Sequence, residues 1–103
     1  MASGTLGQAV LAAGTNTTVY TVPAGKTGSF TVNFQNRAIM STWVRLAIAT
    51  NSTPTASEYV LYDVLVGQYG TVEKTGLVAS AGKNIVVYSS TGNVSVNVYG
   101  FEE

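Results

Sequence analysis

The chain has 103 residues, of which 46% are hydrophobic and 10% charged, and its formal net charge is zero. This length fits one domain around one core, and the composition is too apolar for a disordered chain and too evenly mixed for a membrane-embedded one. The five cations are scattered and form no basic stripe, so the sequence argues against binding of nucleic acid.

The first segment, residues 1–14, is rich in Gly, Ala and Ser and lacks the regular alternation of a strand. It also lacks the basic start of a signal peptide. We therefore expect an extended N-terminal arm over residues 1–14 that becomes ordered against a neighbouring molecule. A β-sandwich domain over residues 15–103 is expected to follow it.

A first strand is expected over residues 17–22, and the motif VPAGKT (22–27) overlaps its end. The last three letters of this motif also end a phosphate-binding loop, but that loop needs a glycine five positions before the Gly-Lys pair, where this chain has Tyr20. The loop also needs a helix directly after it, whereas residues 28–34 alternate with the period of a strand. We interpret the motif as a turn between two strands, with Pro23 ending the first of them.

The next two expected strands, 29–35 and 42–49, each carry apolar side chains at every second position. Because residues two apart in a strand point to the same face, each strand is expected to bury one face and expose the other. In the second of these strands, Trp43 and Arg45 are expected on the face opposite to the core. The predicted core residues are Phe30, Val32, Phe34, Val44, Leu46, Ile48, Val96 and Val98.

The strand expected over residues 58–66 is apolar on both of its faces. Such a strand is usually central in a sheet or meets a partner on one side, and both interpretations stay open. If it is not covered by loops of its own chain, its apolar surface is larger than a monomer usually exposes, which favours a symmetric oligomer. The predicted interface residues are Tyr59, Leu61 and Leu65, with Arg37, Arg45 and Glu58 as polar contacts at the rim.

Three further strands are expected over residues 71–78, 85–89 and 94–101, the first of them polar enough to lie at a sheet edge. Val and Thr supply 29 residues of the chain, and both are β-branched residues that favour strands. About seven short strands with turn signals roughly every 8–12 residues are typical of a sandwich or barrel. The sequence therefore predicts an all-β fold, a single antiparallel β-sandwich that is jelly-roll-like.

Residue types that carry most enzyme chemistry are scarce in this chain. It has no His and no Cys, which removes the commonest general base, thiol nucleophiles and thiolate metal sites. Glu58 and Asp63 have odd spacing on one expected strand, so they point to opposite faces and make a poor carboxylate pair. The terminal pair Glu102–Glu103 is interpreted as a solvated tail. We expect a protein that is not an enzyme and holds no cofactor or metal, with a hydrolase as the remaining catalytic alternative.

Several aromatic residues fall on strand faces opposite to the expected core. Outward aromatic side chains beside polar residues are typical of contact surfaces, although each of them could also cover a loop or complete the core. Together they favour a binding or assembly module. The residues concerned are Trp43, Tyr59, Tyr69, Tyr88, Tyr99 and Phe101.

Several motifs resemble those of small virion structural proteins of tailed bacteriophages, particularly phages of cyanobacteria. The motifs are TNTTVYTVPAGK (15–26), Asn36-Arg37 followed by VRLAIA (44–49), ASEY (56–59) followed by Tyr62-Asp63, EKTGL (73–77) and VYGFEE (98–103). They are scaffold and turn motifs that extend over nearly the whole chain. The resemblance implies a self-contained β-domain of the virion, assembled in the host cytoplasm.

Two positions in the particle are compatible with this resemblance. The first is a capsid cement or decoration protein that binds and stabilises the major capsid protein as a trimer, which fits the local three-fold axes between capsomers. We favour it because the sequence lacks the long repetitive shaft of a fibre. The alternative is a tail or tail-fibre component, including a carbohydrate-binding sandwich that uses Trp43 and exposed tyrosines as stacking platforms.

Overall fold

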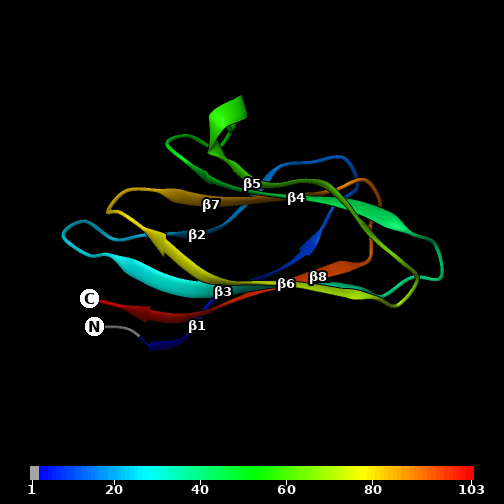
Figure 1. Cartoon of the computed structure of the whole chain (residues 1–103), viewed down its shortest axis with the longest axis horizontal. Helices are drawn as coiled ribbons and strands as arrows, with labels where there is room; N and C mark the ends of the chain where they lie inside the picture. Colours follow the sequence, from blue (N-terminus) through cyan, green and yellow to red (C-terminus); the bar gives the residue numbers. More distant parts are fainter. Residues whose placement is uncertain (1–2) are drawn as a thin grey trace.

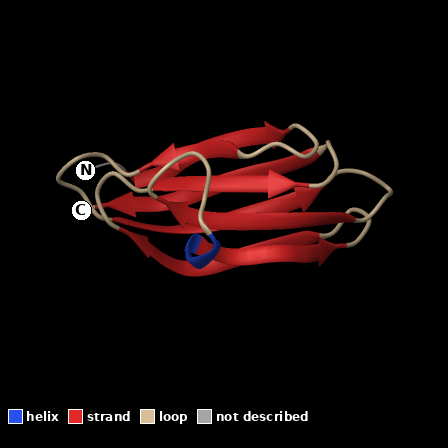
Figure 2. Cartoon of the chain, turned by 90° about the horizontal axis from the view of Figure 1, so that it is seen from above, coloured by secondary structure: helices blue, strands red, loops and turns tan. Residues whose placement is uncertain are grey.

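A computed structural model describes residues 3–103, and it is all-β, with two sheets facing each other (Figures 1 and 2). A short 3-10 helix, η1 (Ala56–Glu58), precedes the fifth strand. The strands are β1 (Ser3–Leu11), β2 (Thr17–Thr21), β3 (Gly28–Asn36), β4 (Thr42–Ala49), β5 (Tyr59–Val66), β6 (Thr71–Ala79), β7 (Asn84–Ser89) and β8 (Val94–Glu102). The sheets have the orders β1-β8-β3-β6 and β2-β7-β4-β5.

The strand pairing is that of a jelly roll. The first strand pairs with the last, β2 with β7, β3 with β6 and β4 with β5, all of them antiparallel. A chain folded back on itself in this way and rolled into two sheets has the eight-stranded jelly-roll arrangement. The predicted antiparallel, jelly-roll-like sandwich is confirmed, and it has eight strands over residues 3–103 where about seven were expected.

The eighth strand lies in the segment that was expected to be a separate arm. Residues 3–11 pair with β8 along their length, as far as Leu11 opposite Val94, and Leu11 is buried in the core. One of the small residues that suggested an arm, Gly7, has a packing role, because a Cβ there would lie 2.1 Å from the carbonyl oxygen of Val19. The division into an arm over residues 1–14 and a domain over residues 15–103 is therefore wrong, because residues 3–11 form a strand of the sandwich. Residues 1–2 of the expected arm lie outside the described part.

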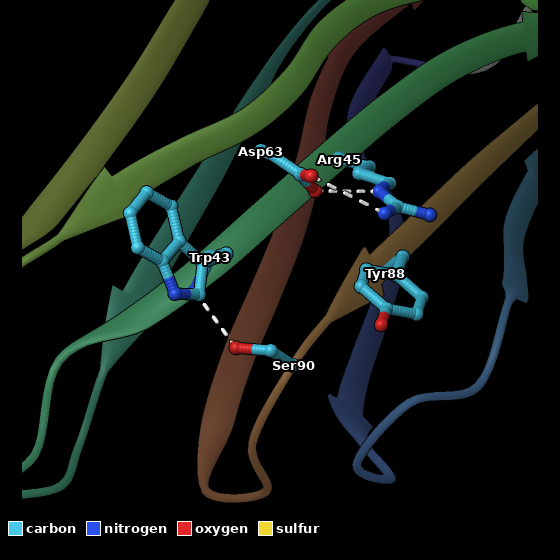
Figure 3. Close-up of a pocket in the computed structure, with 5 residues that line it drawn as sticks. All are labelled: Trp43, Arg45, Asp63, Tyr88 and Ser90. Carbon is cyan, nitrogen blue, oxygen red and sulfur yellow. Dashed lines mark hydrogen bonds and ion pairs between the residues drawn. The ribbon is translucent and has the colours of Figure 1, made fainter.

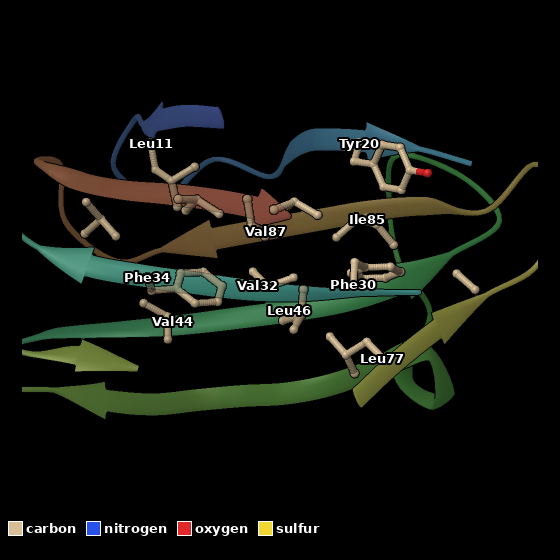
Figure 4. Packing of buried hydrophobic residues seen from close by; sticks show 14 of the residues in the cluster. Leu11, Tyr20, Phe30, Val32, Phe34, Val44, Leu46, Leu77, Ile85 and Val87 are labelled. Carbon is tan, nitrogen blue, oxygen red and sulfur yellow. The ribbon is translucent and has the colours of Figure 1, made fainter. Parts of the chain in front are cut away.

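The core fills the space between the sheets and draws on both (Figure 4). Phe34 is fully buried with Val44 beside it, and Val32 and Leu46 lie nearer the middle of the core. Of the eight predicted core residues, only Ile48 is not fully buried; it is half-buried and packs against the cluster. The seven confirmed residues are Phe30, Val32, Phe34, Val44, Leu46, Val96 and Val98.

Strand β5 is the edge strand of its sheet, so its interpretation as a central strand is wrong. It also does not keep a regular alternation, because β5 carries extra residues opposite β4, including one between Leu61 and Val64. The shift turns both of these side chains towards the core and leaves Leu65 exposed on the outer face. Asp63, inside the bulge, has a φ of 51°, a left-handed conformation that Asp tolerates better than most residues.

The loops gather at the two ends of the sandwich. Ser3, the first described residue, and the C-terminus lie at one end, together with the loops 22–27, 50–58 and 80–83 (Figures 1 and 2). The VPAGKT segment is the β2–β3 connection at this end, so its interpretation as a turn is confirmed, and the Lys26 amide donates to the Pro23 carbonyl at 3.2 Å. The loops 12–16, 37–41, 67–70 and 90–93 lie at the other end.

The C-terminal residues are part of the fold, which corrects their interpretation as a solvated tail. Glu102 is buried, and its carboxylate accepts a hydrogen bond of 2.6 Å from the Tyr20 hydroxyl. Burial, this hydrogen bond and the charge of Glu102 raise the pKa of Tyr20, in that order of size. The main chain of Glu103 pairs with that of Thr27 in both directions, which fixes the chain end beside the β2–β3 turn.

Candidate functional site

The outer face of the sheet β2-β7-β4-β5 carries the largest group of aromatic side chains around one cation. Because Val44 and Leu46 point into the core, the residues between and before them, Arg45 and Trp43, must point outward. Strand β7 adds Tyr88 on one side and strand β5 adds its aromatic residues on the other. We call this surface the aromatic face and define it as Trp43, Arg45, Tyr59, Tyr62, Asp63, Leu65 and Tyr88.

Arg45 is held in one position at the centre of the aromatic face. Its Nε donates to Asp63 Oδ1 at 2.6 Å and its Nη2 donates to Asp63 Oδ2 at 3.3 Å. Its Cζ lies 4.3 Å from the ring centroid of Tyr62 and 4.4 Å from that of Tyr88, so both rings make cation–π contacts. The hydrogen bond to Asp63 raises the pKa of Arg45 further. The result is a rigid and permanently charged guanidinium whose charge is balanced by its partner.

A shallow hollow lies beside this pair (Figure 3). It has a volume of about 270 Å³ and is lined by Trp43, Arg45, Asp63, Tyr88 and Ser90. Trp43 is 48% exposed, and its indole forms one wall. The Ser90 hydroxyl accepts a 3.0 Å hydrogen bond from the Trp43 backbone amide, which fixes the backbone that carries the indole.

The structure divides the predicted interface residues between different surroundings. Arg45 lies on the aromatic face with Leu65, which is opposite Trp43 in the neighbouring strand. Tyr59 is also on this face but is half-buried, and its ring meets that of Tyr62 edge-to-face at 4.9 Å. Leu61 does not lie on the aromatic face, because the bulge in β5 turns its side chain towards the core.

Glu58 and Arg37 do not join the aromatic face. The Glu58 carboxylate accepts backbone hydrogen bonds from Thr55 at 2.8 Å and Thr50 at 3.0 Å, and these two bonds lower its pKa, the first more strongly. Glu58 therefore orders the loop before β5, as part of a capping box with Thr55. Arg37 lies at the end of the sandwich away from the termini, where its amide donates to the Asn93 carbonyl at 2.9 Å.

The loops around Arg37 expose three large side chains that the sequence analysis did not connect. Ile39 and Met40 are each 68% exposed and Tyr69 is 62% exposed. The loops that carry them touch, since the Tyr69 amide donates to the Ala38 carbonyl at 3.1 Å. We call these three residues the apolar tip. Ile39 and Met40 were overlooked because two apolar residues in a connecting segment carry no periodic signal.

The buried side chain of Asn36 fixes the backbone beneath the apolar tip. Its Nδ2 donates to the Met40 carbonyl at 2.8 Å and to the Gly67 carbonyl at 3.1 Å, and its Oδ1 accepts from the Ala38 amide at 3.0 Å. Gln35 adds a hydrogen bond of 3.0 Å to the Tyr69 carbonyl. The tip therefore has a defined shape in the free protein.

The outer face of the other sheet carries a second apolar area, which we call the opposite face and define as Val10, Val78, Tyr99 and Phe101, all exposed. The last three line a hollow of about 440 Å³. The Tyr99 hydroxyl donates to Glu73, and this hydrogen bond is the main cause of a raised Tyr99 pKa. This face thus has a single acidic contact within an apolar area.

No group of three or more acidic, His or Cys residues suited to a metal ion occurs within residues 3–103. In the same range, no helix has the length and apolar character needed to cross a bilayer. No protein-family model, curated protein or solved structure matches the chain. The surfaces described above can act by contact, through apolar area, aromatic rings and fixed hydrogen-bonding groups.

Proposed function

We propose that the chain is a structural protein of a phage virion, a capsid decoration protein that attaches to the major capsid protein through the apolar tip. The observation that carries this proposal is the exposure of Ile39, Met40 and Tyr69 on loops held by Asn36. Because the loops are already ordered, binding loses little conformational entropy, and more of the contact energy appears as affinity.

The composition of the tip supports a protein partner. Aromatic residues, Met and Arg are enriched at protein interfaces, and Arg37 lies beside the tip. Each copy need contribute only a few kcal/mol, since many copies bound to one closed shell act together. Jelly rolls occur in viral capsid proteins and in lectins, which is compatible with the proposal by analogy of fold alone.

The attachment is tested by sedimentation of the purified protein with capsids that lack it. The parent protein is expected to sediment with the capsids, and the double variant Ile39→Asp, Met40→Asp is expected to stay in solution. The double variant Asn51→Asp, Ser52→Asp changes two exposed positions in the loop at the other end of the sandwich, outside the three surfaces, and as the matched control it should bind like the parent. Capsid binding by the tip variant at the level of the parent contradicts an anchor at the tip.

The second part of the proposal is that the protein acts as a symmetric oligomer, with a trimer favoured by the three-fold axes of a capsid. Leu61 no longer supports it, because it faces the core. The oligomer is supported instead by exposed apolar side chains on the two sheet faces, which are Leu65 on the aromatic face and Val78 and Phe101 on the opposite face.

A second candidate function is a tail or tail-fibre component that recognises carbohydrate on the host. The observation that favours it is the hollow on the aromatic face, where the exposed Trp43 lies beside the Arg45–Asp63 pair. An aromatic plane next to fixed polar groups suits a sugar, which has apolar and hydroxyl-bearing sides. A cryo-EM map of the intact virion separates the two candidates, because density for the chain on the shell or on the tail excludes the other position.

A further inference from the structure

The hollow on the aromatic face has the size of a single sugar ring. Its volume of about 270 Å³ is just below the roughly 300–1,000 Å³ of pockets for drug-sized ligands. It is also shallow, with Trp43 and Tyr88 as walls and the Arg45–Asp63 pair between them (Figure 3). A site of this shape can cover one side of a small flat ligand and leave the other side in water.

The polar groups of the hollow keep unused hydrogen-bonding capacity. A carboxylate offers about four acceptor positions, and Asp63 uses one on each oxygen for Arg45. A guanidinium has about five N–H donors, and the two bonds to Asp63 leave others free to reach a ligand. Since Tyr62 and Tyr88 hold the guanidinium in place, both planar groups are already oriented for neighbouring hydroxyl groups.

The charge of the hollow selects among sugars. Arg45 is paired with Asp63 at 2.6 Å, so the two ionised groups that line the hollow sum to zero. A carboxylated or sulfated sugar would gain from the cation but would be repelled by the adjacent carboxylate. A neutral sugar can bond to both groups without a net electrostatic cost.

We infer that this hollow binds one neutral pyranose ring, with the apolar side of the ring on the Trp43 indole and adjacent hydroxyls bonded to Asp63 and Arg45. The inference rests on the proposed recognition of carbohydrate and is independent of the capsid anchor at the tip. It holds for a chain on the shell as well as for one on the tail. It names the class of ligand and the polar partners of this site.

Trp43 is the single Trp of the chain, so the intrinsic fluorescence of the unmodified protein reports on this hollow. The full chain is titrated with D-glucose, D-galactose, D-mannose, N-acetyl-D-glucosamine and L-rhamnose, which differ in the orientation or substitution of their hydroxyls. At least one of them is expected to give a saturable blue shift with a Kd of about 1 mM, as suits a ligand of few atoms. D-glucuronate, the charged counterpart of glucose, is expected to bind at least tenfold more weakly than the best neutral sugar.

The variant Asp63→Asn distinguishes a specific binding site from non-specific adsorption of sugar to the aromatic side chains. Asn tolerates the left-handed conformation at this position, so the backbone is kept while the charge of Arg45 becomes unbalanced. We expect the affinity for the neutral sugar to fall at least tenfold and the affinity for D-glucuronate to rise. Glu73→Gln removes one charge from the opposite face and serves as the matched control. It should bind the neutral sugar with the affinity of the parent. Ligand-observed NMR extends the comparison to Trp43→Ala, which should lose binding, and to Tyr99→Ala, which should keep it.

The inference is overturned if none of the five neutral sugars shifts the fluorescence or binds by NMR. It is equally overturned if D-glucuronate binds the parent more tightly than they do, or if Asp63→Asn behaves like Glu73→Gln. Sedimentation of the Asp63→Asn variant with capsids measures capsid binding separately from sugar binding. A parent protein that binds capsids but no sugar leaves the decoration role standing and removes the pyranose site.

Discussion

Replacement of Asn36 by Ala tests whether one buried side chain sets the shape of the apolar tip. The change removes the donor to the Met40 carbonyl and the acceptor of the Ala38 amide, while the Gly67 carbonyl keeps its bond from the Gly70 amide. An unsatisfied buried group costs about 1–3 kcal/mol, and two such groups close to a surface, where water replaces part of the loss, give about 2–4 kcal/mol of unfolding free energy. A domain of this size has about 5–15 kcal/mol in total, so the variant should still fold.

The loss is measured by thermal unfolding followed by circular dichroism, where it corresponds to a fall in Tm of about 10–20 °C. Amide exchange should become faster in residues 37–41 and 67–70 before it does in the sheets, because only these loops lose their support. Asn33→Ala is the matched control, since Asn33 is on the same strand and half-buried on its outer face, and it should change stability by about 0.5 kcal/mol or less. Equal stability of the two variants, or unchanged exchange in the loops of Asn36→Ala, refutes the reasoning.

Three further predictions concern the core, a titrating group and the oligomer. Phe34→Ala should lower the free energy of unfolding by about 3–5 kcal/mol in urea titrations, because the side chain is fully buried and leaves a cavity, and an unchanged midpoint contradicts this. Burial and Glu102 raise the pKa of Tyr20 above 10.0, so its contribution to stability is complete below about pH 10 and is lost as the pH rises further. The free energy of unfolding should therefore fall less steeply with pH in Tyr20→Phe than in the parent. Tyr69→Phe, at an exposed position, should leave this pH dependence unchanged. Light scattering should show an oligomer for the parent and a folded monomer for whichever of Leu65→Asp and Val78→Asp lies in the self-contact, while a monomeric parent excludes the oligomer.

Periodic patterns predicted the strands well, since each of the seven expected strands matches an observed one to within one residue at either end. What the patterns could not give is β1, in which Gly7 is required by tertiary packing. Gly7 lies against the backbone of Val19, and its strand pairs with residues at the other end of the chain, such as Gln8 with Asn97. Neither contact leaves a local signal, so a strand with small residues reads like a flexible segment.

The candidate site was predictable only in part, for a related reason. Alternation in β4 placed Trp43 and Arg45 on the outer face, and that expectation is confirmed. The contacts that give the site its chemistry come from other strands, with Asp63 from β5 and Tyr88 from β7. The same bulge that presents Asp63 also accounts for the inward position of Leu61, because one extra residue between Leu61 and Val64 puts both side chains on the same face of the sheet.

The bulges also limit where a further strand could pair with this protein. All four edge strands carry an extra residue relative to the strand they pair with, whereas the inner pairs β3–β8 and β4–β7 run without a shift in register. An extra residue twists a strand and interrupts the row of free amides and carbonyls that a further strand would need. Charged side chains lie on two of the edge strands, Asp63 on β5 and Glu73 and Lys74 on β6, so on β1 and β2 the bulges alone interrupt the edge. The proposed contacts with partners are therefore expected on side chains of the aromatic face, the opposite face and the apolar tip, and single substitutions at these surfaces test each contact separately.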